Sequence, residues 1–167
     1  NENNLCFEEF GDFVEVWAVT SVPGNILSSY GWKSKILPPG VRKTNICTQL
    51  DRNDDLIEVL VLGGYEPRKG QDLAIDMLTN LPLATRDSIR LNFHGRVVDR
   101  AFHHELVERA EPFPSVVSLS TALSPDDAQE AIGRADIVLI PSRDESFSLV
   151  VAEALLQSAI VVCSKSV

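Results

Sequence analysis

Short apolar runs alternate with helical patterns from Glu58 onward, and this alternation limits the fold more than any other feature. Five runs predict strands: Val59–Leu62, Ile89–Phe93, Val116–Leu119, Ile137–Ile140 and Ile160–Cys163. Between them, apolar residues recur at helical spacing, as in Leu73, Met77, Leu78 and Leu81, and again in Phe102, Leu106, Val107 and Ala110. Strands joined by helices pair in parallel, because the connection is long enough to cross the sheet. The sequence therefore predicts an α/β domain with a doubly wound, parallel, Rossmann-like sheet.

The loop after the first expected strand carries glycines and positive charges. It runs from Gly63 to Gly70 with the sequence G-G-Y-E-P-R-K-G. Ligands of such sheets bind at the carboxyl ends of the strands, so this loop is a candidate site. Gly63 and Gly64 let the backbone approach a ligand, and Arg68 and Lys69 bring two cations to a helix start, as a phosphate clamp requires. An ordinary strand–helix turn with solvated basic residues has the same composition. Neither a Walker loop nor the G-x-G-x-x-G pattern is present.

A second candidate loop lies in the stretch 135–164, which predicts strand, polar loop, helix over Phe147–Leu156, and strand. Glu145 stands at the helix entrance, and Glu153 stands inside the helix between two alanines, where a carboxylate is costly without a partner. Free amides at the helix start favour a phosphate, and carboxylates accept hydrogen bonds from sugar hydroxyls. The pair indicates a nucleotide-diphosphate sugar, although each acid alone also fits an exposed surface position.

The segment P-S-R-D-E-S-F-S-L-V-V-A-E-A-L, with Glu145 and Glu153 separated by seven residues, resembles the motif of retaining GT-B glycosyltransferases of the group 1, family 4 type. The resemblance covers roughly Val59–Ser164 and includes the R-K-G of the first loop. It implies the donor-binding, C-terminal half of a two-domain GT-B enzyme. Such an enzyme moves a sugar from a nucleotide-diphosphate sugar, with retention, to an acceptor that is a sugar, a lipid or a protein. No cofactor or metal is implied.

The resemblance also implies a role for individual residues. Glu145 would face the transferred sugar, Glu153 the ribose, and Arg68 and Lys69 the diphosphate; Glu145, Arg68 and Lys69 are the candidate catalytic residues. The other candidate substrate-binding residues are Gly63, Gly64, Gly95, Phe147, Ser148, Leu149 and Val150.

The turn at His94, Gly95 and Arg96 would lie near the nucleoside in this family. By itself, a lone histidine at a strand end predicts a structural residue with satisfied hydrogen bonds, and this is the interpretation favoured for His94. Two departures from the family pattern are visible. Gly64 stands where many members carry arginine, and Ser158 and Ile160 stand where glycine and proline are common.

Residues 1–40 are expected to form the tail of a preceding domain, because K-I-L-P-P-G-V at Lys35–Val41 resembles the crossover between the two GT-B domains. An N-terminal extension packed on the sheet would give the same pattern. Within it, Val14–Val19 predicts a strand and Asn25–Tyr30 a helix. Residues 41–57 are expected to be a linker and 58–167 the nucleotide-sugar-binding domain, truncated at its C-terminus. Asp51–Asp55 resembles an Asp-x-Asp metal motif, but it follows no buried strand and fits a solvated loop better.

Composition excludes several classes of partner. A net charge of −9 argues against nucleic acid and anionic membranes. Three scattered cysteines indicate neither a disulfide framework nor a metal cluster, and favour a reducing, cytoplasmic setting. No stretch predicts a signal peptide or a membrane span. The start at Asn1 indicates a fragment, so an N-terminal domain of the same chain, with any membrane association it carries, is expected to be missing.

Functions other than sugar transfer from a donor to an acceptor remain open. One is a standalone nucleotide-sugar-binding module without catalysis. Another is a sugar-nucleotide epimerase or a phosphorylase, and a phosphorylase would need a cofactor lysine that the sequence does not place. No Ser-His-Asp or Cys-His pattern is present, so the residues support stabilisation of a leaving group only. The fragment alone is expected to be inactive.

Overall fold

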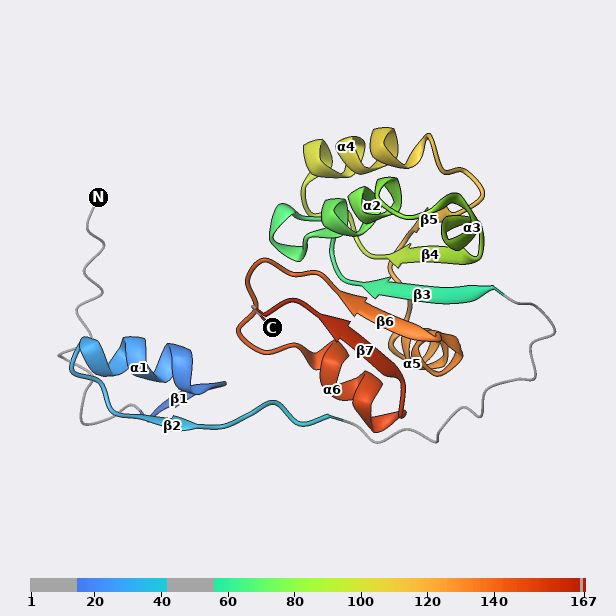
Figure 1. The fold of residues 1–167 in the computed structure, drawn as a ribbon. Coiled ribbons are helices and arrows are strands. Elements are labelled where there is room, and N and C mark those ends of the chain that lie inside the picture. The colour runs from blue at the N-terminus through green and yellow to red at the C-terminus, as the bar shows by residue number, and fades with distance from the viewer. Residues whose placement is uncertain (1–14, 42–55, 166) are drawn as a thin grey trace. The chain divides into compact units, whose positions relative to one another are not determined.

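The computed structural model describes residues 15–41, 56–165 and 167, which fall into two compact units divided between Gly40 and Val41 (Figure 1). The smaller unit contains β1 (Val16–Ala18), α1 (Ser21–Ser29) and β2 (Ser34–Ile36), and its two strands pair in parallel. The expected strand and helix therefore both form, with the helix starting earlier than Asn25. The left-handed φ of 83° at Gly31 follows the end of α1, a conformation that glycine adopts without strain. Val14, Asp51–Asp55 and most of the expected linker lie outside the described residues.

The larger unit is built on a five-stranded parallel sheet in the order β5-β4-β3-β6-β7. Its strands are β3 (Ile57–Leu62), β4 (Ile89–His94), β5 (Val117–Ser120), β6 (Ile137–Ile140) and β7 (Ile160–Cys163). All five predicted strands form, and their ends differ from the prediction by no more than two residues. The doubly wound α/β fold is confirmed.

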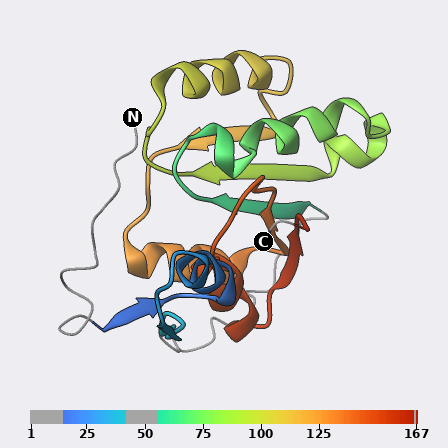
Figure 2. The same cartoon turned by 90° about the vertical axis from the view of Figure 1, so that its left-hand side faces the viewer.

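Helices cover both faces of this sheet (Figures 1 and 2). On one face lie α2 (Gln71–Thr79), α3 (Leu83–Asp87) and α4 (Arg100–Ala110), and on the other lie α5 (Pro125–Arg134) and α6 (Leu149–Leu156). Leu91 and Phe93 pack under the first group, whereas Leu60 and Val138 pack under the second. Leu81 was predicted to extend α2, but the helix ends at Thr79, because Pro82 disfavours helical backbone at the residue before it.

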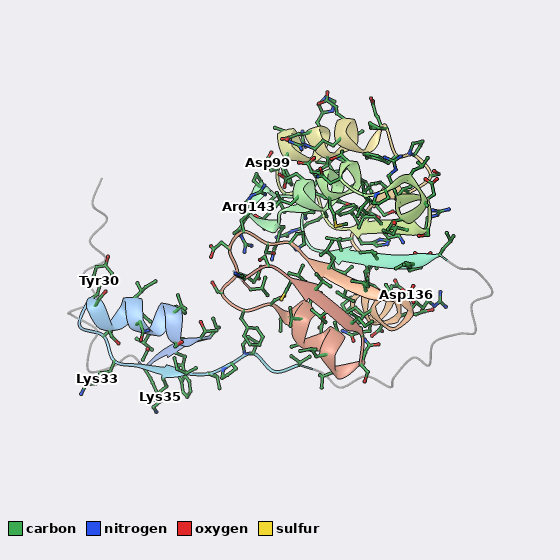
Figure 3. The ribbon with its side chains drawn as sticks, in the orientation of Figure 1. Tyr30, Lys33, Lys35, Asp99, Asp136 and Arg143 are labelled. Atoms are coloured by element: carbon green, nitrogen blue, oxygen red, sulfur yellow. The ribbon has the colours of Figure 1, made fainter. Side chains whose placement is uncertain are left out.

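Polar side chains fix where the elements begin. Ser124 caps α5 as its sequence predicts, accepting a hydrogen bond from the Asp127 amide at 3.2 Å. Asp99 caps α4 by accepting from the Phe102 amide at 3.0 Å. Asp136 accepts from the Glu58 amide at 2.7 Å and joins β6 to β3 at the amino ends of these strands, away from Arg143 at the carboxyl ends (Figure 3). Among the described residues, every helix is too short or too polar to cross a bilayer.

The strand order reverses between β3 and β6, and the loops after these strands touch at this switch point. Gly70 has a φ of 67°, and a Cβ there would lie 2.2 Å from the Pro141 carbonyl oxygen. A Cβ at Gly95, after β4, would lie 2.0 Å from the Gly63 carbonyl oxygen. Three loops at the carboxyl edge therefore pack backbone to backbone, which residues with side chains would prevent.

Because Gly95 lies so close to the Gly63 carbonyl, we expect a side chain at position 95 to lower stability. Gly95→Ala should lower the free energy of unfolding by roughly 1–3 kcal/mol, because the added methyl overlaps a backbone carbonyl that cannot move alone. Gly40→Ala is the matched control, since a Cβ there meets nothing within 4 Å, and it should change stability by about 0.5 kcal/mol or less. Urea unfolding of both variants measures the difference, and equal stability of the two would contradict the close contact.

Candidate active site at the carboxyl edge

Arg68, Lys69 and Glu145 meet at the switch point of the sheet. The Lys69 Nζ atom lies 2.7 Å from Glu145 Oε2, and an Arg68 guanidinium nitrogen lies 3.6 Å from the same oxygen. Arg68 also donates to the carbonyl of Asp144 at 3.1 Å, and the Arg143 amide donates to the Arg68 carbonyl at 2.8 Å. The structure thus brings together the three residues predicted as catalytic, from loops that lie 76 positions apart.

The three side chains of this cluster, Arg68, Lys69 and Glu145, differ in how far they are buried. The Glu145 side chain is 9% exposed and the Lys69 side chain 22%, whereas Arg68 keeps 44% of its side chain exposed and also pairs with Glu66. A shielded ion pair is stronger than a solvated one, so Lys69 and Glu145 hold each other in place. Arg68 remains accessible to a ligand that carries negative charge.

A second ion pair, between Asp72 and Arg143, holds the loop after β6 against α2, and sequence reasoning did not find it. The Arg143 guanidinium donates to both Asp72 carboxylate oxygens, at 2.8 and 2.6 Å, and to the Pro67 carbonyl at 2.7 Å. Hydrogen bonds from Arg143 hold the pKa of the Asp72 carboxyl below its usual value, although burial acts in the opposite direction. The two residues are 71 positions apart, so no local pattern indicates the pair.

The Gly63–Gly64 turn lies beside Lys69, one of the two cations of this cluster. Gly63 has a φ of 150°, and a Cβ there would contact the methylene carbons of Lys69 at 3.7–3.8 Å. At Gly64, a Cβ would lie 2.7 Å from a methyl carbon of Val98, so the arginine that many members of the resembled family carry there would have to displace that side chain. Gln71 donates from Nε2 to the Gly64 carbonyl at 2.8 Å and fixes the turn to the start of α2.

Glu153 lies apart from this cluster, on the side of α6 that contacts α5. Gln129 of α5 donates a hydrogen bond to the Glu153 carboxylate, and the Gln157 amide, one turn further along α6, donates to Gln129 Oε1 at 2.7 Å. Burial raises the pKa of the Glu153 carboxyl, and the bond from Gln129 offsets part of this effect. The carboxylate that looked costly in the sequence therefore has an amide partner in Gln129.

The start of α6 offers free backbone amides. Ser148 caps the helix by accepting from the Val151 amide at 3.4 Å, and the Ala152 amide donates to the Ser148 carbonyl. The amides of Leu149 and Val150 precede this first intrahelical bond, and Phe147 is partly buried just before the cap. These amides stand close in sequence to Glu145, and the sequence predicted that amides at this helix start would favour a phosphate.

The prediction for His94 was wrong. The Nδ1 atom of His94 is buried and has no hydrogen-bond partner, so this histidine is not a satisfied structural residue. In α4, by contrast, the His103 ring packs on the Tyr65 ring with centroids 4.9 Å apart. Within the described ranges, no three His, Cys, Asp or Glu side chains are grouped as a metal site would need.

This sheet order and these helices form the α/β fold of one half of a GT-B glycosyltransferase. A sequence profile of the family described as Glycosyl transferases group 1 matches residues 42–167, most of the chain. The chain therefore belongs to this family, and the predicted resemblance is confirmed. A comparison with curated proteins finds no match.

Solved glycosyltransferase structures share the fold at low sequence identity. WaaG, a glycosyltransferase involved in lipopolysaccharide biosynthesis, superposes with a TM-score of 0.76 at 21% identity, over 91% of this chain and 44% of that chain. Anabaena Alr3699/HepE in complex with UDP-glucose gives 0.76 at 18% identity, over 95% and 47%. A mutant of S. aureus TarM in complex with fondaparinux, alpha-GlcNAc-glycerol and UDP gives 0.73 at 17% identity, over 93% and 31%. The chain thus spans less than half the length of each of these proteins.

The Asp72–Arg143 pair predicts a specific pH dependence. Asp72→Asn should lower the free energy of unfolding by roughly 1.5–3 kcal/mol at pH 7, the range for hydrogen bonds to charged groups. A depressed carboxyl pKa adds stability above the unfolded value of 3.8, and this stability is lost as the pH falls through the lower folded value. The difference between wild type and Asp72→Asn should therefore be constant above about pH 5 and shrink toward pH 2.

Asp76→Asn is the matched control for this measurement. Asp76 lies on the same helix and pairs with Arg109, but its side chain is 48% exposed, compared with 12% for Asp72. The control should cost at most about 1 kcal/mol. Thermal unfolding between pH 2 and pH 8 compares the two variants, and an equal loss in both would show that Arg143 does not clamp the loop.

Proposed function

We propose that this chain is the donor-binding half of a retaining glycosyltransferase and that it binds a nucleotide-diphosphate sugar at the carboxyl edge of its sheet. One observation carries the proposal: Lys69 lies 2.7 Å from Glu145 at the switch point, with Arg68 beside them, in a chain of the group 1 family. Ligands of open α/β sheets bind at this position. The UDP-glucose in the Anabaena HepE complex and the UDP in the TarM complex support a nucleotide-sugar ligand for this fold.

Arg68 and Lys69 would act on the diphosphate. As the bond between the sugar and the diphosphate breaks, negative charge builds on the leaving phosphate, and fixed cations stabilise that charge. The free amides of Leu149 and Val150 and the positive end of the α6 dipole add to this effect. No metal is needed in this proposal, because two side-chain cations and a helix start supply the positive charge.

Glu145 and Glu153 would hold the two hydroxyl-rich ends of the donor. Glu145 is adjacent to the cations, so it can accept from hydroxyls of the sugar next to the diphosphate. Before a donor binds, Glu145 is also the partner of Lys69, and a diphosphate must compete with it for that lysine. Glu153 lies further along α6, beside Gln129, in a position to accept from ribose hydroxyls.

The acceptor, which we propose is a sugar, a lipid or a protein, would be bound by another domain. The family profile begins at residue 42, and the described residues before Val41 belong to a separate unit, as a piece of a preceding domain would. On this proposal the cleft that joins donor and acceptor is formed with that domain.

The phosphate clamp makes a prediction about ligand affinity. UDP or GDP should bind at least tenfold more tightly than uridine or guanosine, because the nucleosides lack the groups that contact Arg68, Lys69 and the α6 amides. Lys69→Gln should remove much of this preference. Arg134→Gln is the control for lost charge, since Arg134 is exposed near the last turn of α5 and pairs with Glu130. Isothermal titration measures each affinity, and equal binding of nucleoside and diphosphate would refute the clamp.

The two acids should differ in what they recognise. Glu153→Gln should weaken UDP and UDP-sugar alike by about tenfold or more, since hydrogen bonds to charged groups contribute roughly 1.5–3 kcal/mol. Glu145→Gln should weaken the UDP-sugar alone and leave UDP unchanged or slightly tighter, because it frees Lys69 from a competing carboxylate. Titration of both ligands into both variants tests this assignment. If the two substitutions changed both affinities equally, the assignment of Glu145 to the sugar and Glu153 to the ribose would be wrong.

Thermal unfolding supplies the control for Glu153→Gln. The raised pKa means that ionised Glu153 destabilises the fold, and this cost grows as the pH rises from the unfolded value of 4.5 through the folded value. The glutamine variant should therefore melt at the wild-type temperature or higher at pH 7. Glu130→Gln, an exposed acid on α5, should alter neither melting nor affinity.

A further expectation is that the chain alone does not transfer sugar. The proposed acceptor site belongs to another domain, so the purified chain should bind the donor and hydrolyse it slowly at most. Incubation with UDP-sugars and simple sugar acceptors, followed by chromatography of the products, measures transfer. Turnover at the rate of an intact enzyme would contradict the half-enzyme proposal.

A further inference from the structure

The Arg143 side chain joins the loop after β6 to the loop after β3 and to the start of α2. Its Nη1 atom donates to the Pro67 carbonyl at 2.7 Å and to Asp72 Oδ1 at 2.8 Å, and its Nη2 atom donates to Asp72 Oδ2 at 2.6 Å. Pro67 stands two positions before Lys69, and Arg143 stands two positions before Glu145. This side chain at the carboxyl end of the sheet therefore connects the two loops close to the point where Lys69 meets Glu145 (Figure 3).

The Pro67 carbonyl belongs to a short 3-10 turn, Pro67–Lys69, that carries both cations of the site. This carbonyl already accepts from the Gly70 amide at 3.2 Å, and Arg143 gives it a second, charged donor. The Arg143 amide also donates to the Arg68 carbonyl at 2.8 Å. Arginine side chains that bond the last carbonyls of a helical turn stabilise its end. Arg143 therefore fixes the turn that presents the two cations.

The Arg143 guanidinium is occupied by partners from its own chain. It forms a bidentate pair with both Asp72 oxygens, and the Asp72 side chain is largely buried. A bidentate arginine–carboxylate pair fixes the orientation of both side chains in addition to attracting them. Arg143 is thus placed to hold the geometry of the site, whereas Arg68 and Lys69 are placed to meet a ligand.

The loop after β6 is anchored at three successive residues. Pro141 packs against the backbone of the loop after β3, and the Ser142 carbonyl accepts a hydrogen bond from the Ser164 hydroxyl beyond β7. Arg143 is the third anchor and lies nearest to Glu145 in sequence. Two peptide units span about 7 Å at full extension, so an anchored Arg143 restricts where Glu145 can lie.

We propose that Arg143 is a positioning residue of the donor site. Through Asp72 and Pro67 it holds the two loops together, sets the separation between the cations and Glu145, and thereby raises the affinity for a nucleoside diphosphate. This inference rests on the proposed donor-binding function and deepens it, because it gives the Asp72–Arg143 pair a role in binding that is separate from its effect on stability. Binding groups depend on such supporting contacts, since small displacements weaken them strongly.

Asp72→Asn tests the proposal because electrostatics and positioning predict opposite results. The substitution removes a negative charge and frees the positive charge of Arg143, so electrostatics alone would make an anionic ligand bind more tightly. Loss of the bidentate pair, by contrast, loosens the two loops. We expect the affinity for UDP to fall about threefold to tenfold, the value of one hydrogen bond at the ligand. Isothermal titration of the 167-residue chain, well below its melting temperature, measures the affinity of the folded protein.

A double-substitution cycle shows whether Arg143 acts through Lys69. Arg143→Gln should weaken UDP and inorganic pyrophosphate by about threefold to tenfold when Lys69 is present, and by about twofold or less in the Lys69→Gln background. Direct contact between Arg143 and a phosphate would give additive losses instead. Arg143→Lys keeps the charge but cannot form the planar fork, so it should recover only part of the affinity that Arg143→Gln loses.

Arg109→Gln is the matched control for the loss of an arginine. Arg109 pairs with Asp76 on α2 and with Glu105 on its own helix, α4. This variant should lower the melting temperature slightly and leave the affinity for UDP unchanged. A merely structural Arg143 would behave in the same way, with a lowered melting temperature and unchanged affinity in Arg143→Gln.

Three results would overturn the inference: unchanged or tighter binding of UDP by Asp72→Asn, additive losses in the cycle with Lys69, and unchanged affinity in Arg143→Gln. If Arg143→Gln does not fold, Asp72→Asn and Arg143→Lys decide the question. If the wild-type chain binds no nucleoside diphosphate, the proposed function fails together with this inference. If the wild type binds UDP and the variants bind it equally well, only the positioning role of Arg143 fails.

Discussion

The contact between the backbones of the loops after β3 and β6 is the constraint on which the site depends. Gly70 adopts a left-handed conformation and lies so close to Pro141 that no side chain fits between them. Because of this approach, Lys69 can reach Glu145 at 2.7 Å and Arg68 can bond the carbonyl of Asp144. The charged groups are therefore positioned by steric exclusion of side chains, and their own attraction adds to an arrangement that the backbone has already fixed.

The positive charges of the candidate site are grouped at one place in a protein whose net charge is negative. A chain with a net charge of −9 would repel an anionic ligand at long range, so binding of the proposed donor would depend on a short-range cation cluster. Arg68 and Lys69 provide this cluster, and the acid between them keeps it compact in the absence of a ligand. The Asp72–Arg143 pair has a different task, because both of Arg143's charged contacts go to Asp72 and hold the loop in place.

Several polar groups near the proposed nucleotide are less well partnered than polar groups elsewhere in the domain. Burial disfavours the ionised carboxyl of Glu153, and His94 Nδ1 and Gln71 Oε1 lack partners. The capping side chains of Ser124 and Asp99, by contrast, accept hydrogen bonds from backbone amides at the starts of their helices. Unsatisfied groups that gather at one edge of an otherwise consistent fold are typical of a functional site.

Sequence alone determined the parts of this protein that depend on neighbours along the chain. The five strands followed from short apolar runs, the cap at Ser124 from local hydrogen bonding, and the candidate loops from the rule that ligands bind at strand carboxyl ends. The end of α2 at Thr79 was missed, because the helical spacing of Leu81 was given more weight than the proline after it.

Only the tertiary structure decided which side chains face each other. The pairing of Asp72 with Arg143, the contact of Glu145 with Lys69 and the unsatisfied Nδ1 of His94 join or separate residues on different strands and loops. Such relations depend on strand order, register and the close packing of glycine turns, and no single segment carries that information. The sequence therefore determined which residues could form the site, and the fold determined which partner each of them has.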